Sequence, residues 1–133
     1  MISITKDDID IEAMIERAKK PNIGAIVIFL GTVRDNGIAS LELEAFEEVA
    51  LRDLQTINDS AVHLYHLQSV DIIHRTGKLS VGDSILLIIC GAKHRQEAFA
   101  GCEFILEKIK EHVPIWKKEI RTDGHRWIEG DHT

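Results

Sequence analysis

The sequence predicts an α+β fold with a mostly antiparallel sheet and helices packed on it. Two observations support this class. Apolar segments alternate between short β-type runs and stretches of helical period, in the order β, β, α, β, β, α, β, β after a leading helix, and turn signals separate the neighbouring strands. The 133 residues, 44% of them hydrophobic, are enough for one domain, which we expect to span residues 1–133.

In the first half, apolar residues at helical spacing predict a helix over about 7–19, which Pro21 ends. The unbroken apolar run 25–30 predicts a buried central strand, and Asp35-Asn36-Gly37 turns the chain after it. Leucine or alanine alternates with glutamate over 41–45, as in a half-exposed strand. A second helix is expected over about 47–66.

In the second half, residues 70–75 and 84–90 are expected to form two strands joined by a tight glycine-containing connection. A third helix over 95–112 has the clearest periodicity, with an apolar stripe at Phe99, Cys102, Ile105, Leu106 and Ile109. Strands over 115–121 and 125–129 flank Asp123-Gly124, a strong hairpin signal. We expect the helices to cover one face of the sheet.

Composition excludes several classes of protein. Seven aromatic residues are too few for a platform that stacks nucleic-acid bases, and the longest apolar run, 85–90, is too short to span a membrane. No signal-peptide pattern begins the chain, so we expect a cytoplasmic protein. Cys90 and Cys102 lack metal or redox spacing and are expected to be reduced core residues. No zinc, Walker or dinucleotide motif is present, and we expect neither a metal nor a cofactor.

Charge is unevenly distributed along the chain. The net charge is −6, yet residues 67–133 hold ten cations and ten anions, so the whole acidic excess lies in residues 1–66. The segment 93–126 is locally basic, with eight cations, six anions and three histidines. A site for anions is therefore expected late in the chain.

His94 and Arg95 lie between a buried strand and the start of the third helix. Free amides at a helix N-terminus, together with these side chains, suit a phosphate or a carboxylate. The alternative is a polar loop whose cations contact only water, and the residues alone do not decide between the two.

Lys110 lies about 80° from the centre of the apolar stripe of the third helix. A lysine at this flank can border a cleft between helix and sheet, where a lowered pKa makes it useful as an acid, a base or a nucleophile. The alternative is a lysine that extends to solvent and pairs with Glu107.

Lys117 and Lys118 are adjacent on a predicted strand and must point to opposite faces of the sheet. Only one of them can share a pocket with Lys110, and alternation alone does not choose between them. Arg34 follows the first strand and can reach a pocket at that end of the sheet, although an exposed turn arginine fits equally. His74, inside a strand, is expected to be a hydrogen-bonded structural residue.

Six segments together resemble the large catalytic subunit of the molybdopterin synthase family, in order and in spacing. They are Ile28-Phe29-Leu30-Gly31-Thr32-Val33-Arg34, Leu43-Glu44-Ala45-Phe46-Glu47-Glu48, Ile73-His74-Arg75-Thr76-Gly77, Ala92-Lys93-His94-Arg95, Lys110, and Pro114-Ile115-Trp116-Lys117-Lys118-Glu119. The resemblance extends from about residue 24 to residue 129.

The resemblance implies an α/β-hammerhead fold and a sulfurtransferase. The expected partner is a small ubiquitin-like sulfur-carrier subunit whose C-terminal thiocarboxylate donates two sulfurs to cyclic pyranopterin monophosphate. The expected assembly is a homodimer within a heterotetramer. By resemblance, the catalytic residues are Lys110 and Lys117, and the substrate-binding residues are Val33, Arg34, His94, Arg95, Lys118 and Glu119. The alternative is a non-catalytic protein that binds a phosphorylated ligand or a carrier tail with the same basic residues.

Overall fold

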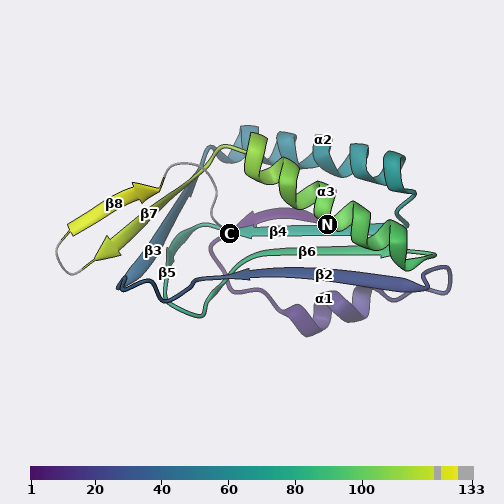
Figure 1. Cartoon of the computed structure of the whole chain (residues 1–133), viewed down its shortest axis with the longest axis horizontal. Coiled ribbons are helices and arrows are strands. Elements are labelled where there is room, and N and C mark those ends of the chain that lie inside the picture. Colours follow the sequence, from purple (N-terminus) through teal and green to yellow (C-terminus); the bar gives the residue numbers. More distant parts are fainter. Residues whose placement is uncertain (122–123, 129–133) are drawn as a thin grey trace.

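The computed structural model describes residues 1–121 and 124–128, which form two four-stranded sheets and three helices (Figure 1). Sheet A has the strand order β1-β4-β6-β2 and sheet B the order β5-β3-β7-β8. The strands of sheet A are β1 (Ile2–Thr5), β4 (Ser69–Arg75), β6 (Ser84–Ala92) and β2 (Ala25–Thr32). Those of sheet B are β5 (Gly77–Leu79), β3 (Ser40–Ala45), β7 (Ile115–Arg121) and β8 (Gly124–Ile128). Within the described residues every strand pair is antiparallel except β1 with β4, which confirms the predicted α+β class.

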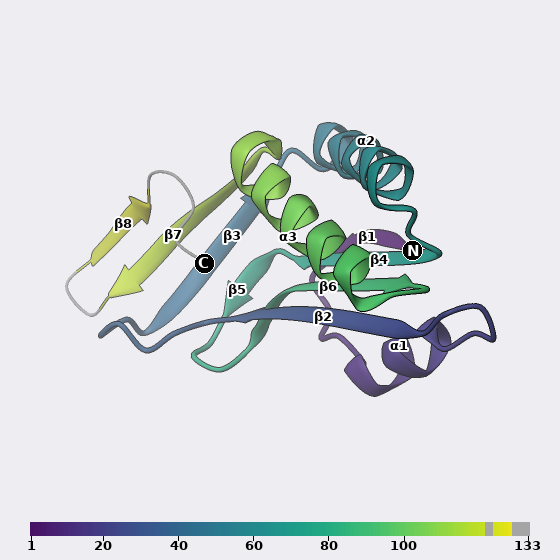
Figure 2. The same cartoon turned by 45° about the vertical axis from the view of Figure 1, so that its right-hand side comes forward.

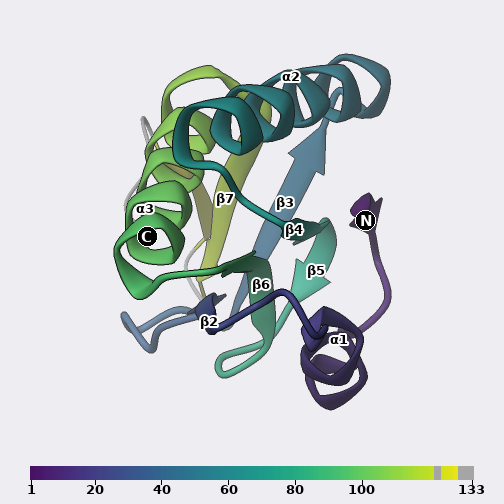
Figure 3. The same ribbon diagram turned by 90° about the vertical axis from the view of Figure 1, so that its right-hand side faces the viewer.

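The helices lie on both faces of sheet A, so the expectation of one covered face is wrong. Helices α2 (Glu47–Tyr65) and α3 (Arg95–His112) lie on one side and α1 (Ile11–Ala18) on the other (Figures 1 and 3). The reason is that β4 and β6 carry buried apolar residues on both of their faces. Ile72 and Ile88 pack beneath α2 and α3, whereas the next residues along each strand belong to a second cluster with α1.

Strand β2 is an edge strand rather than the central strand expected from its apolar run. Its Val27 and Phe29 pack against the core beneath α3. Ile28 and Leu30 face the other way and remain 40% and 38% exposed, because the eight-residue α1 packs on β4 and β6 and does not reach them. The apolar run therefore predicted a strand correctly, but the central position expected for that strand was wrong.

Two strands, β1 and β5, are absent from the sequence prediction because both are very short. Strand β1 has four residues and is stabilised only by its parallel pairing with β4. Strand β5 has three residues, follows β4 after one intervening residue, and pairs with β3 in sheet B. The expected sheet is two sheets, because the strand pairs of β3 and β7 are separate from those of β4 and β6, and the chain passes from sheet A to sheet B at Thr76.

The predicted helices and hairpins are otherwise confirmed, with local corrections. The first helix begins at Ile11 rather than at about residue 7, because the Asp10 side chain caps it by accepting a hydrogen bond from the Ala13 N–H. Phe99 of the expected α3 stripe is 61% exposed, and Ala98 and Gly101 are buried instead. Asp35 accepts a hydrogen bond from the backbone N–H of Gly37, which forms the turn after β2. Strands β7 and β8 pair as expected, whereas Asp123 of the connecting turn and residue 129 lie outside the described residues.

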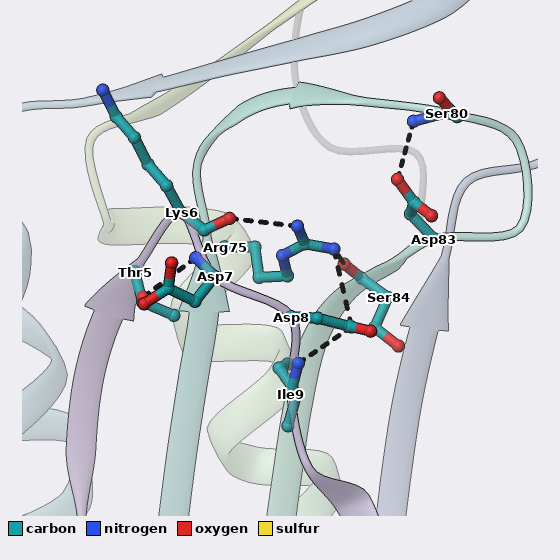
Figure 4. Close-up of polar contacts among 9 residues, drawn as sticks. All are labelled: Thr5, Lys6, Asp7, Asp8, Ile9, Arg75, Ser80, Asp83 and Ser84. Atoms are coloured by element: carbon teal, nitrogen blue, oxygen red, sulfur yellow. Dashed lines mark hydrogen bonds and ion pairs between the residues drawn. The ribbon is translucent and has the colours of Figure 1, made fainter.

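A buried arginine fixes the junction between the two sheets (Figure 4). The Arg75 guanidinium donates hydrogen bonds to the carbonyl oxygens of Lys6 and Ser84, and it lies 3.7 Å from the Asp8 carboxylate. These bonds join the segment after β1, the end of β4 and the start of β6. Arg75 thus holds the N-terminal segment at the point where the chain leaves sheet A.

The two cysteines are confirmed as buried, free thiols at the contact between β6 and α3. A hydrogen bond with Cys102, together with burial, raises the pKa of the Cys90 thiol. Cys90 is therefore a protonated core residue, not a nucleophile.

Candidate active site

Two adjoining cavities contain most of the residues that the sequence singled out. The first, which we call the arginine cavity, has a volume of about 510 Å³ and lies between the end of β2 and the strands β3, β7 and β8. Its charged lining residues in the described part of the chain are Arg34, Lys117, Glu119 and Arg126, and Val33 also lines it. Val33 and Arg34, expected to bind substrate, thus lie together with Lys117.

The second, which we call the lysine cavity, has a volume of about 400 Å³ and lies between the C-terminal end of α3, the end of β4 and the strands β7 and β8. Lys110 enters it from α3, Lys117 from β7 and His74 from β4. Figure 2 shows α3 crossing above the strands of sheet A, with its C-terminal end beside β7. Lys117, Trp127 and Ile128 line both cavities, so the two adjoin at Lys117.

Lys110 borders a cavity because of its position on the helix. Ile109 is 5% exposed and points into the core, which places the next side chain at the edge of the buried face. Lys110 is accordingly half-buried and lies against sheet residues, as expected for a lysine at the flank of the stripe.

The register of sheet B decides between Lys117 and Lys118. Lys117 pairs with Leu43 of β3, whose side chain is buried in the core, so Lys117 points to the core-facing side of the sheet. Lys118 points to the outer side, where its ammonium lies 3.2 Å from the Glu42 carboxylate and 5.1 Å from the centre of the Trp127 ring. The structure therefore brings Lys117 into both cavities and Lys118 into neither.

Glu119 is the carboxylate among the described residues of the arginine cavity. Its side chain is 5% exposed and forms ion pairs with Arg121 and Arg126. Burial by itself raises the pKa of a carboxyl group, but the hydrogen bonds and charges of the two arginines outweigh it and hold the pKa of Glu119 below its usual value. Glu119 is therefore an ionised group that orients two arginines at the rim.

His94 and Arg95 lie at the opposite end of α3 from the lysine cavity. His94 is the N-cap residue of the helix and lies 3.2 Å from the Glu97 carboxylate, and Arg95 begins the helix with an exposed side chain. Lys110 lies fifteen positions after Arg95 on the helix, which corresponds to roughly 22 Å along the axis. The structure of one chain does not bring these residues together.

The two cavities have an excess of positive charge, whereas the whole chain has an excess of negative charge. Their described lining residues include four permanently or usually cationic side chains, Arg34, Lys110, Lys117 and Arg126, against one carboxylate. The net charge of the protein is −6. Such a local excess of cations suits anionic substrates.

The described residues contain neither a cluster of metal ligands nor a membrane-spanning helix. Over 1–121 and 124–128, no three histidine, cysteine, aspartate or glutamate side chains lie close enough together to hold a metal ion. No helix in that part of the chain has both the length and the apolar character needed to cross a membrane.

Sequence reasoning missed three residues of the cavities. Arg126 and Ile128 lie on β8, where only a hairpin was expected, and their pairing with Glu119 and Lys117 places them on the core-facing side once the register is known. His74 was expected to be structural because it interrupts an apolar strand. The sequence did hold one indication of a role for His74, because it is a polar residue next to an arginine at the end of a buried strand.

Comparison with known proteins assigns the family. The family model described as MoaE protein matches residues 4–112. The molybdopterin synthase catalytic subunit of Pyrococcus abyssi is 38% identical over 98% of this chain and 92% of its own length. That of Bacillus subtilis is 40% identical over 94% of this chain and 82% of its own.

Solved structures agree with the sequence relatives. The crystal structure of molybdopterin synthase from Staphylococcus aureus superposes with a TM-score of 0.89 at 36% identity, over 97% of this chain and 96% of that one. The molybdopterin biosynthesis MoaE protein from Burkholderia ambifaria superposes with a TM-score of 0.85 at 38% identity, over 100% and 92%. These matches confirm the resemblance inferred from the sequence motifs and the expectation of an enzyme of this kind. The chain belongs to the MoaE family, whose relatives named here are molybdopterin synthase catalytic subunits.

Proposed function

We propose that this chain transfers sulfur from the C-terminal thiocarboxylate of a small ubiquitin-like carrier subunit to cyclic pyranopterin monophosphate, in two successive steps that form the dithiolene of molybdopterin. The observation that carries the proposal is the pair of cation-lined cavities that adjoin at Lys117. Both substrates are anions, and fixed cations in a partly enclosed site lower the free energy of bringing them together. The free, buried cysteines fit the cytoplasmic location that we expect.

Lys110 and Lys117 are the proposed catalytic residues. They enter the lysine cavity from different elements, α3 and β7, and can therefore approach one substrate from two sides. In this proposal one lysine acts as a base and accepts a proton, while the other acts as an acid and donates one. Proton transfer of this kind is needed as the cyclic phosphate opens and sulfur adds.

Val33, Arg34 and Glu119 are proposed to contact substrate in the arginine cavity. Arg34 supplies a positive charge from the end of β2, and Glu119 keeps Arg126 oriented at the rim. Because Lys118 points away from both cavities, we expect its replacement by alanine to reduce sulfur transfer less than the replacement of Lys117.

His94 and Arg95 are proposed to act on the site of a second copy of the chain. Most of the length of α3 separates them from Lys110 in their own chain, roughly 22 Å from Arg95, and a small cyclic phosphate cannot span that distance. A homodimer that places the N-terminus of α3 near the partner's cavities resolves the difficulty. We therefore expect Arg95→Ala to weaken precursor binding while leaving the carrier affinity unchanged.

Reconstitution with the thiocarboxylated carrier and the cyclic precursor tests the function. Lys110→Ala is expected to slow molybdopterin formation by roughly 10²-fold or more, since a positioned acid or base contributes about that much. The matched control is Lys108→Ala on the same helix, because Lys108 pairs with Glu111 and stacks on Phe104 away from the cavities. Near-wild-type turnover by Lys110→Ala would remove the lysine from the mechanism. Binding of both substrates without product would instead indicate a non-catalytic protein.

A further inference from the structure

His74 is a titratable side chain of the lysine cavity to which neither the family resemblance nor the proposed function assigns a role. It occupies the penultimate position of β4 and is 4% exposed. Its neighbours in register are Ile4 on β1 and Leu86 on β6. The charged groups that face the same cavity from the other described elements are Lys110 on α3 and Lys117 on β7. A buried imidazole thus lies in the wall of a cavity lined by two lysines.

The hydrogen bond of the ring determines its tautomer. Nδ1 lies 2.8 Å from the backbone carbonyl oxygen of Arg75. A carbonyl oxygen only accepts hydrogen bonds, so Nδ1 carries the proton and donates. In a neutral ring Nε2 is then an acceptor.

We propose that His74 is a positioning residue for the lysines of this site: in the neutral tautomer whose Nδ1–H donates to the Arg75 carbonyl oxygen, Nε2 accepts a hydrogen bond from an ammonium group of the lysine cavity and fixes that group relative to the substrate. The inference rests on the proposed function, because it gives the lysines the task of moving protons. It also gives a buried histidine at the end of β4 a role in the cavity that it lines. A merely structural histidine would need the Nδ1 bond alone.

The first test uses the unaltered protein and does not depend on any variant folding. Nitrogen-15 NMR of the histidine-labelled protein, at about pH 7, distinguishes protonated from unprotonated ring nitrogens. The His74 signals are assigned by their loss in His74→Asn or, if that variant does not fold, in His74→Gln. We expect a protonated Nδ1 and an unprotonated Nε2. A proton on Nε2 overturns the proposal, because Nε2 could then no longer accept.

The second test separates the two ring nitrogens. Asparagine places a donor near the position of Nδ1 and lacks Nε2, whereas glutamine places an amide near Nε2. We expect His74→Asn to slow single-turnover sulfur transfer roughly tenfold or more, with precursor affinity within about twofold of wild type, and His74→Gln to recover most of the rate. The exposed histidine of α2, as His63→Asn, is the matched control.

The outcomes distinguish this proposal from the function on which it rests. If the wild-type chain forms no molybdopterin in reconstitution, the proposed function fails. If the wild type is active and His74→Asn matches it while His74→Gln is slow, the role of His74 is structural and this proposal alone is wrong. If His74→Asn does not fold, the ring protonation measured in the wild type decides.

Discussion

Replacing Glu119 by glutamine removes a buried negative charge from between two arginines, and the cost can be estimated from their exposure. A hydrogen bond to a charged group contributes about 1.5–3 kcal/mol, whereas an exposed ion pair contributes about 0–1 kcal/mol. Arg121 is 30% exposed and Arg126 is 63% exposed. The bond to Arg121 therefore contributes near the lower end of its range, and the bond to Arg126 contributes little to the free energy of unfolding. We expect Glu119→Gln to lower the free energy of unfolding by about 2 kcal/mol at neutral pH.

Thermal unfolding followed by circular dichroism, at fixed protein concentration, measures this loss. With an unfolding entropy of about 0.28 kcal/mol per kelvin for a chain of this length, the expected decrease in Tm is about 7 °C. The pKa of Glu119 is lowered in the folded state, so its stabilisation is present above the unfolded pKa and is lost as the pH falls through the folded pKa. The difference between wild type and variant should therefore shrink as the pH falls from about 7 to about 3.

A matched control is Glu42→Gln, which breaks the more exposed pair with Lys118 on the outer face of sheet B. We expect it to cost less than about 1 kcal/mol. If Glu119→Gln is as stable as wild type at neutral pH, or if its deficit is the same at all pH values, the buried-charge account of Glu119 is wrong.

Two further changes test the packing that positions the site. Gly24→Ala should destabilise the protein by about 1–3 kcal/mol in denaturant unfolding, because a Cβ there lies 2.4 Å from the Lys93 carbonyl oxygen of the backbone. The comparison is Gly82→Ala, which meets no atom within 4 Å and bears only the strain of its positive φ; an equal or larger loss there would contradict the steric argument. Arg75→Met should cost about 2 kcal/mol and speed hydrogen exchange at the Thr76 amide, which donates to Thr5 of the N-terminal segment. Unchanged exchange would show that Arg75 does not hold that segment.

Much of the fold follows from local patterns because the long elements have strong periodicity. The helix α3 and its flank lysine are examples, since Lys110 borders a cavity where the stripe of buried residues ends. The faces of Lys117 and Lys118 could not be chosen from alternation, because both alternation sets contain polar and apolar residues. The choice needed the register with β3, which places Lys117 opposite the buried Leu43.

The parts that sequence reasoning missed depend on contacts between distant segments. Strand β1 is too short to be stable alone and exists through its pairing with β4, some seventy residues away. The edge position of β2 depends on which strands pair with β6, not on the composition of β2. A role for His74 could not be predicted, because it depends on α3 and β7 bringing Lys110 and Lys117 to the same cavity.

The helix α3 connects two places where anions are expected to bind, and this constrains its length as well as its composition. Each residue advances a helix by about 1.5 Å and rotates it by about 100°. Deleting one residue between Ala98 and Ile109 would preserve the chemistry of every remaining side chain and still rotate Lys110 away from the edge of the buried face. A change of chain length within α3 therefore alters where a charge lies in relation to its substrate, even when every functional side chain is kept.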